Sequence, residues 1–187
     1  MTDLKQRLLA DTVEYLASNG ASDVSLRQLA AALGTSHRML IYHFGSKEGL
    51  LIEVVHAMEQ RHRDVFAELE LDPDASPADV ARWFWQRLSD PAMWPYERLF
   101  FEMYGRALQG DPCAAPLLDG IVDSWLAPLA EWNRSQGIPS PEAQATARLG
   151  LAVARGLLLD LLATGDRESV EAAMEQFIAM YEEITKG

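Results

Sequence analysis

The segment between Ser25 and Phe44 constrains the fold more than any other part of the chain. It reads SLRQLAAALGTSHRMLIYHF, in which two short runs with helical spacing of apolar residues are separated by Gly34. Ser25 followed three residues later by Gln28 is the pattern of a capping box, in which each side chain satisfies a free backbone N–H group. Two short helices joined by a tight turn that contains glycine form a helix-turn-helix.

This predicted helix-turn-helix has a buried side and an outward side. The residues expected to be buried between its two helices are Leu29, Ala30, Leu33, Leu40 and Ile41. Thr35 or Ser36 is expected to cap the second helix, whose free N–H groups then favour phosphate. The residues expected to face outward are His37, Arg38, Met39 and Tyr42.

Those outward side chains suit DNA. Arginine can bond guanine through two hydrogen bonds, methionine can touch a thymine methyl group, and tyrosine can bond a phosphate. The alternative is a surface helix pair in an ordinary helical domain, where an exposed Arg38 or His37 has no partner to recognise.

The rest of the chain also indicates helices. An amphipathic first helix is expected between Leu4 and Ala17, and a fourth from Ser46 to about residue 69. Residues 71–80 are a predicted linker, within which Ser76-Pro77 is a helix start signal. No strand pattern of useful length occurs, so we expect an all-α fold of about nine helices. The predicted domains are a helix-turn-helix domain over 1–46 and a larger helical domain over 47–187, linked by the fourth helix.

Charge is distributed unevenly along the 187 residues, whose net charge is −12. Residues 1–63 hold seven basic and seven acidic side chains, whereas the remainder holds nine basic and 21 acidic ones. An acidic body repels phosphate, so it would orient DNA toward the N-terminal end of the molecule.

Several classes of protein are disfavoured. No run of 18 apolar residues predicts a membrane span, and the charged N-terminus does not have the form of a signal peptide. The single cysteine, Cys113, fits a reducing, cytoplasmic location. No enzyme motif is present, and His56 and His62 are spaced six apart, which does not place them on one helix face for a metal. We therefore expect neither an enzyme nor a bound cofactor or metal.

Residues 25–51 resemble the DNA-binding domain of the TetR family of bacterial transcriptional regulators. The matching positions are Ser25, Leu29-Ala30, Gly34-Thr35-Ser36, Leu40, His43-Phe44, Lys47-Glu48 and Leu50. Two positions depart from the family pattern. Arg38 stands where the family often has glycine, and the family's usual tyrosine falls at Ile41, which cannot bond a phosphate. Tyr42 is the neighbour expected to take that role.

The resemblance implies contacts to DNA residue by residue. Ser25 and Arg27 would contact phosphate or the groove edge, and His37, Arg38 and Met39 would face bases. Tyr42, His43 and Lys47 would hold backbone phosphates, while Ser36 caps the recognition helix. His43 has a second interpretation as a packed residue at the end of that helix.

The resemblance also implies that the larger domain binds a small molecule. Aromatic side chains are concentrated there, and ligand pockets are usually apolar and aromatic with a few polar groups. The residues predicted to contact a ligand are Trp85, Phe101, Glu102 and Trp125. Each aromatic residue could equally be part of the core, and Glu102 could belong to an ion-pair row with Arg98 and Arg106.

The resemblance also implies a dimer, and one predicted helix has a composition that suits a helix–helix interface between two copies. Residues 143–163 are rich in alanine, glycine and leucine, and glycine inside a helix costs about 1 kcal/mol, which close helix approach would offset. The predicted interface residues are Leu149, Val153, Gly156, Leu157, Asp160, Met174 and Phe177. Asp160 either pairs with Arg155 or Arg148 across this interface or binds a cationic ligand.

Together these features predict a homodimeric transcriptional regulator. It would be a repressor that a small apolar or aromatic ligand releases from a palindromic double-stranded DNA operator. The alternative is a helical ligand-binding or scaffold protein that does not bind specific DNA.

Overall fold

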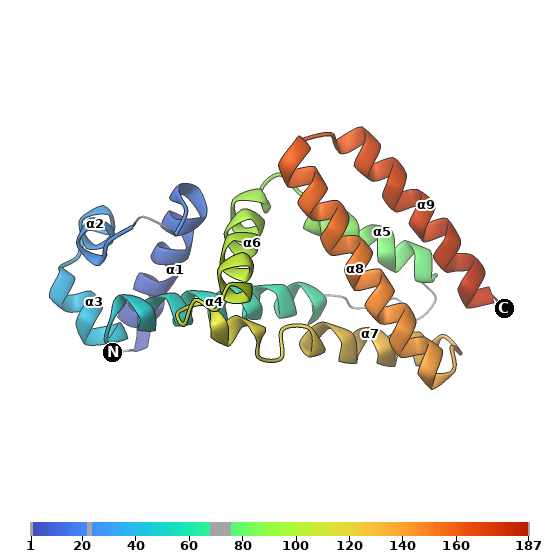
Figure 1. The fold of residues 1–187 in the computed structure, drawn as a ribbon, viewed down its shortest axis with the longest axis horizontal. Coiled ribbons are helices and arrows are strands. Elements are labelled where there is room, and N and C mark those ends of the chain that lie inside the picture. The colour runs from blue at the N-terminus through green and yellow to red at the C-terminus, as the bar shows by residue number, and fades with distance from the viewer. Residues whose placement is uncertain (1, 22–23, 68–75, 187) are drawn as a thin grey trace. The chain divides into compact units, whose positions relative to one another are not determined.

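The computed structural model describes residues 2–21, 24–67 and 76–186. These residues form nine α-helices and one short 3-10 helix, with no strand among them, which confirms the all-α prediction (Figure 1). The elements are α1 (Thr2–Asn19), α2 (Leu26–Ala32), α3 (His37–Phe44), α4 (Lys47–Ala67), α5 (Pro77–Leu88), α6 (Trp94–Leu108), η1 (Ala115–Leu118), α7 (Asp123–Ser135), α8 (Ser140–Thr164) and α9 (Arg167–Lys186). In the described part of the chain, no helix has the length and apolar character needed to cross a membrane.

The chain packs into two compact units. The first comprises Met1–Phe66 and Pro95–Ile121, and the second comprises Ala67–Trp94 and Val122–Gly187. The first unit therefore adds most of α6 and η1 to the four N-terminal helices. These are units of packing, and the functional division near residue 46 stays a prediction.

A small apolar core holds α2 and α3 together. Its buried members are Leu8, Leu29, Ala30, Leu40, Phe44 and Leu50. Leu33 only packs against this core, and the expected burial of Ile41 is wrong, because 37% of its surface is exposed. Leu40 and Phe44 lie four residues apart and share the inner face of α3, which turns the intervening Ile41 away from it.

Local capping fixes where these helices begin. Ser25 and Gln28 form the predicted capping box at α2. The Ser36 hydroxyl, rather than Thr35, caps α3 by accepting the Met39 N–H at 3.1 Å. Ser46 accepts the Gly49 N–H at 3.1 Å at the start of α4, whose expected end near residue 69 lies outside the described residues. Ser76 caps α5 as predicted, while residues 71–75 of the predicted linker are also outside them.

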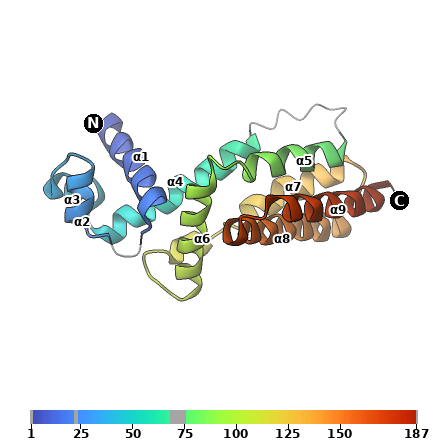
Figure 2. The ribbon, with the colours of Figure 1, turned by 90° about the horizontal axis from the view of Figure 1, so that it is seen from above.

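In the second unit, α8 and α9 form an antiparallel hairpin that turns at Gly165, a left-handed residue with φ of 72°. Helix α7 lies along α8, and α5 lies along α9 (Figures 1 and 2). A buried polar contact links three of these helices: Tyr181 donates to Asn133 Oδ1, and Asn133 Nδ2 donates to the Ala143 carbonyl at 3.1 Å. Burial raises the pKa of Tyr181 to about 12, so its hydroxyl keeps the proton that it donates.

The end of α3 and the first turn of α4 approach each other closely at Gly49. A Cβ atom placed on Gly49 would lie 2.2 Å from the Phe44 carbonyl oxygen and 3.7 Å from Ser46 Oγ. The first contact is with backbone, which cannot move aside as a flexible side chain could. Only glycine therefore fits at this position.

We predict that Gly49→Ala lowers the free energy of unfolding by about 1–3 kcal/mol, as overpacked sites usually do. The matched control is Gly105→Ala in α6 of the same unit, where an added Cβ meets nothing within 4 Å. The control should gain up to about 1 kcal/mol from helix propensity. Urea unfolding at one fixed protein concentration measures both, and an equal response of the two variants would contradict the steric argument.

Candidate nucleic-acid interface

The outward surface of α2 and α3 is strongly exposed. Tyr42 has 68% of its surface accessible, the largest fraction among the exposed large apolar side chains of the described residues. The other exposed positions that the sequence assigned to this surface are Ser25, Arg27, Ser36, His37 and Arg38. Lys47, at the first turn of α4, is half-buried.

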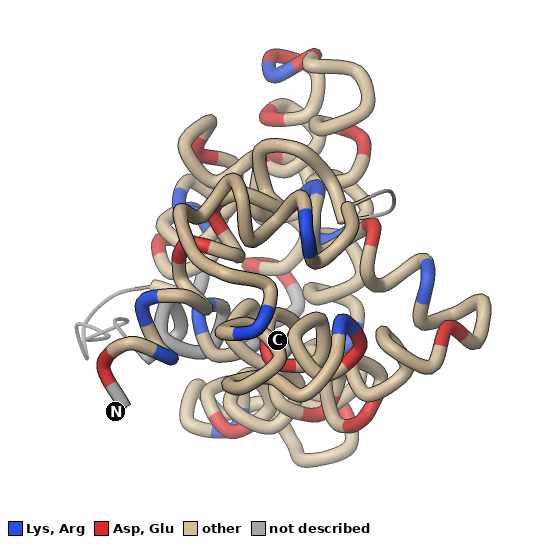
Figure 3. Tube along the Cα trace, turned by 90° about the vertical axis from the view of Figure 1, so that its left-hand side faces the viewer, with Lys and Arg blue, Asp and Glu red and all other residues tan. Residues whose placement is uncertain are grey.

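This surface also differs in charge from the rest of the chain. From Val24 to Lys47 the sequence contains three basic side chains and no acidic one, in a protein whose net charge is −12. The basic residues are Arg27, Arg38 and Lys47. Figure 3 marks the basic and acidic positions along the trace. The stretch is thus basic within an acidic chain, and basic side chains are the usual partners of phosphate groups.

The acid-free stretch ends at Glu48, in the first turn of α4. A hydrogen bond from its own backbone N–H, and a second bond from Ser46, lower the pKa of the Glu48 carboxyl. The carboxylate therefore remains ionised at the positive end of the helix dipole. It marks the boundary of the basic surface.

Two predicted contact residues lie on the flank of this surface. Met39 is half-buried and packs against the small core. His43 is half-buried, and its Nε2 atom is inaccessible and has no hydrogen-bond partner in the described part of the chain. Its ring centroid lies 5.0 Å from that of Tyr42 and 6.2 Å from that of Phe44. This geometry supports the packing interpretation of His43.

Helix α6 holds the connection between α1 and α2 in place through a hydrogen bond, a role that the sequence did not reveal. The backbone N–H of buried Ala21 donates to both carboxylate oxygens of Glu102, at 3.2 Å and 3.1 Å. The predicted contact of Glu102 with a ligand stays a prediction, and in the structure its carboxylate accepts this backbone N–H group. The two residues are 81 positions apart, and nothing in the local pattern links them.

A second group of contacts fastens α6 to the same unit. The Tyr96 hydroxyl donates to Glu14 Oε2 at 2.8 Å, which raises the pKa of the tyrosine. The Arg61 guanidinium of α4 lies 4.0 Å from the centroid of the Tyr96 ring, a cation–π geometry. Lys5 of α1 and Glu53 of α4 form an ion pair at 2.8 Å. The helix-turn-helix is therefore supported by a scaffold of α1, α4 and α6.

The predicted ligand residues fall into different units. Trp85 and Trp125 are buried in the second unit, where the Trp125 and Phe84 rings meet edge to face at 5.6 Å. The Trp85 Nε1 atom is inaccessible and has no hydrogen-bond partner among the described residues. Phe101 and Glu102 are half-buried in the first unit.

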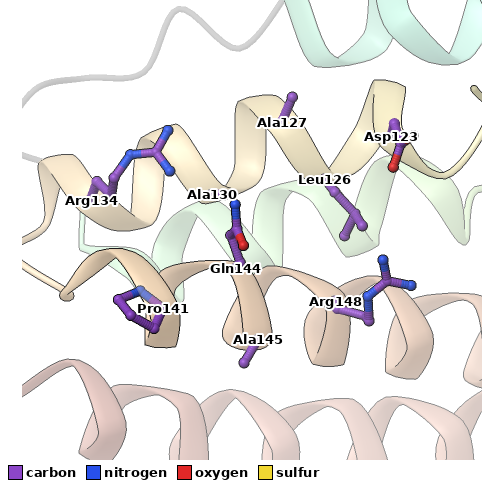
Figure 4. A pocket seen from close by; sticks show the side chains of 9 residues that line it. All are labelled: Asp123, Leu126, Ala127, Ala130, Arg134, Pro141, Gln144, Ala145 and Arg148. Carbon is purple, nitrogen blue, oxygen red and sulfur yellow. The ribbon is translucent and has the colours of Figure 1, made fainter.

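A groove of about 740 Å³ runs between α7 and α8 on the second unit, partly open to solvent. It is lined by Asp123, Leu126, Ala127, Ala130, Arg134, Pro141, Gln144, Ala145 and Arg148. Figure 4 shows Arg134 and Pro141 at one end and Asp123 and Arg148 at the other. The sequence did not predict this groove, because its sides come from two helices whose pairing is a property of the tertiary fold.

The predicted interface residues differ in exposure. Leu149, Gly156 and Asp160 are exposed on α8, and Val153, Leu157 and Phe177 are half-buried. Met174 has only 4% of its surface accessible and packs inside its own chain. Elsewhere in the described residues, no group of three or more His, Cys, Asp or Glu side chains could hold a metal ion.

We predict that Glu102→Ala leaves the buried Ala21 N–H without an acceptor, at a cost of about 1–3 kcal/mol. Hydrogen exchange of the Ala21 amide should accelerate in this variant. Glu102→Gln keeps one carbonyl oxygen at the same place and should retain most of the protection. Equal exchange rates in the wild type and Glu102→Ala would show that this contact does not hold the corner.

Comparison with known proteins bears on these features. Residues 8–54 match the model of the tetR family of bacterial regulatory proteins, so the resemblance stated from the sequence is confirmed. A comparison with curated protein sequences gives no match.

Solved structures show the same fold over nearly the whole chain. A TetR transcriptional regulator from Legionella pneumophila has 18% identity, covers 94% of this chain and 95% of its own, and superposes with a TM-score of 0.77. A transcriptional regulator from Rhodococcus sp. Rha1 has 24% identity, 95% coverage of each chain and a TM-score of 0.79. A regulator from Saccharomonospora viridis, solved in complex with choline, has 23% identity, coverage of 98% and 97%, and a TM-score of 0.75. Residues 8–54 thus resemble the tetR family of bacterial regulatory proteins, and the chain has the fold of these solved regulators.

Proposed function

We propose that the protein is a homodimeric repressor that binds a palindromic operator and is released from it by a small ligand. The observation that carries the proposal is the exposed, acid-free surface of α2 and α3, from which Arg38 and Tyr42 project. A bacterial chromosome lies in the cytoplasm, so this is the compartment that we propose.

Each residue of the surface has a proposed part in DNA binding. Helix α3 would enter the major groove, where His37 and Arg38 reach base edges. Tyr42 and Lys47 would contact phosphates, as would Ser25 and Arg27 at the start of α2. Ser36 holds the first turn of α3, so that its N-terminus faces the groove. Met39 and His43 would act mainly by packing behind this surface.

A dimer would supply two such surfaces. A single α3 reaches only a few base pairs, and two copies related by a two-fold axis would read two half-sites about 34–36 Å apart. Such symmetry requires a palindromic operator. The exposed apolar residues of α8 and α9, among them Leu149, Leu159 and Met180, offer a face on which two copies can pack.

The second unit is the proposed ligand-binding part. Trp85 and Trp125 supply buried aromatic surface, and the unpartnered Trp85 N–H would donate to an acceptor on the ligand. We therefore expect a small apolar or aromatic effector that carries at least one hydrogen-bond acceptor. Binding of the effector would tilt α4 and change the separation of the two DNA-binding surfaces of the dimer, one on each copy. The regulator from Saccharomonospora viridis, which has the same fold, was solved with choline.

The alternative is a helical ligand-binding or scaffold protein without specific DNA binding. The net charge of −12 favours it, since most of the molecule repels phosphate. The two proposals differ in one measurable property, which is sequence-selective and salt-sensitive binding of duplex DNA.

We predict that electrophoretic mobility shift with DNA from around its own gene gives a sequence-selective complex that weakens as salt rises. Arg38→Ala should change the preferred base at one position in each half-site, at about 1–3 kcal/mol of discrimination, while Lys47→Ala should weaken binding to all sequences alike. Both side chains leave the small core untouched, so circular dichroism should not change. Binding that ignores sequence, in the wild type as in Arg38→Ala, would support the scaffold alternative.

The ligand-release model predicts coupled changes in stability and DNA affinity. In a panel of small aromatic compounds, those that raise the melting temperature should also weaken the DNA complex. Trp85→Phe removes only the indole N–H and part of the ring, and it should reduce both effects together. Compounds that stabilise the protein strongly and leave DNA affinity unchanged would contradict the model.

A further inference from the structure

One end of the groove between α7 and α8 carries two opposite charges that do not pair with each other. Figure 4 shows Asp123 of α7 and Arg148 of α8 at this end, on the two sides of the groove. Both residues are exposed, and neither has a hydrogen bond or an ion pair with any residue that the structure describes. An anionic group and a cationic group therefore face the same end of one groove without a partner within the described chain.

The groove beside these two charges is apolar. Leu126 is half-buried there, and Ala130, which has only 4% of its surface accessible, forms the floor further along. Ala127 and Ala145 contribute small side chains to the lining, which leaves the groove hollow. Its volume of about 740 Å³ lies within the range of known small-molecule sites.

The walls of the groove are held in place by a buried polar contact. Asn133 of α7 is 1% exposed, and its Nδ2 atom donates to the Ala143 carbonyl of α8 at 3.1 Å. Tyr181 of α9 donates in turn to Asn133 Oδ1. These bonds are made by the immediate sequence neighbours of Arg134 and Gln144, which line the groove. A ligand would therefore enter a preformed site, which lowers the entropic cost of binding.

The far end of the groove offers a weaker site for a charged group. Arg134 lies there beside Pro141, and its guanidinium already forms an ion pair with Glu131, one turn earlier in α7. The positive charge of this arginine is thus partly neutralised within the chain. The charged part of a ligand should bind at the opposite end, where the two unpaired side chains lie.

We propose that this groove binds a small zwitterion with an apolar side chain, of the class of the free aliphatic α-amino acids. The Arg148 guanidinium would donate two parallel hydrogen bonds to the carboxylate of the ligand. The ammonium group of the ligand would donate to the Asp123 carboxylate, and its alkyl chain would lie over Leu126 toward Ala130. The inference does not rest on DNA binding, and it concerns a different place from the buried tryptophans to which the aromatic effector was assigned.

A ligand with a single charge complements this end of the groove less well. A monocarboxylate would bring its negative charge close to Asp123, and an amine would bring its positive charge close to Arg148, so each would meet a like charge. The net charge of −12 also repels a free anion from the molecule as a whole, whereas a zwitterion has no net charge to repel. An exposed ion pair between the two side chains would add little stability, so both are free to turn toward a ligand.

Three ligands with matched alkyl chains test the charge requirement by isothermal titration calorimetry. Norleucine carries both charges, hexanoate lacks the ammonium group, and pentylamine lacks the carboxylate. Norleucine should bind the full-length protein at least tenfold more tightly than either analogue. Hexanoate or pentylamine binding as tightly as norleucine, or no binding of norleucine at millimolar concentration, would overturn the proposal.

The length of the alkyl chain tests the apolar part of the groove. Affinity should rise from glycine through alanine and norvaline to norleucine, by up to about fourfold for each methylene group that is buried. Equal affinities for glycine and norleucine would show that the chain does not lie over Leu126, and would overturn the proposed binding mode.

Two variants that remove one charge each should have opposite effects on different ligands. Asp123→Asn should weaken norleucine binding by about tenfold or more and tighten hexanoate binding, because the like charge is gone. Arg148→Gln should weaken norleucine binding to a similar degree and tighten pentylamine binding. The matched control is Arg134→Gln at the far end, which should change norleucine binding by less than about twofold. Equal norleucine affinity in the wild type and both charge variants would overturn the site.

A further variant separates this groove from the proposed effector site. Trp85→Phe should leave norleucine binding unchanged, because Trp85 does not line the groove. If Trp85→Phe abolishes norleucine binding and Arg148→Gln does not, the amino acid binds among the aromatic residues and the groove proposal fails. Failure of norleucine to bind would leave the proposed repressor intact, and loss of sequence-selective DNA binding would leave the groove site intact.

Discussion

The outward surface of α2 and α3, which we call the reading surface, depends on the burial of a few apolar side chains behind it. Leu29, Leu40 and Phe44 face inward together, and this fixes the rotation of α2 and α3 about their own axes. Once α3 is fixed in that rotation, His37, Arg38 and Tyr42 lie on its solvent-facing side. The exposure of these polar and basic side chains is thus a consequence of the small core, because the face of α3 that packs on the core leaves the opposite face to solvent.

Local signals in the sequence identify much of this region. The capping residues Ser25, Ser36 and Ser76 act within three positions of themselves, so their effect is readable from the sequence. Ile41 was misassigned because an apolar residue beside Leu40 satisfies the helical spacing almost as well. The contact between Glu102 and Ala21, and that between Tyr96 and Glu14, join segments about 80 residues apart, where no local signal exists.

The support of the helix-turn-helix by α6 has a mechanical consequence. Glu102 and Tyr96 hold α1 and its corner to a helix that belongs to the same compact unit, and Arg61 adds α4 to the group. A displacement of α4 would then carry α1 and α6 with it. The reading surface would therefore move as one body, which is what a change in the separation of two such surfaces requires.

Glycine in the middle of α8 also bears on where the stability of the second unit comes from. Gly150 and Gly156 each cost the helix about 1 kcal/mol relative to alanine, and neither is needed for packing within the chain. The half-exposed Leu149 and Leu159 likewise gain little in an isolated chain. In the proposed homodimer, a second copy would cover these residues. Part of the free energy that stabilises this unit would then be gained only on association, so its stability should depend on protein concentration.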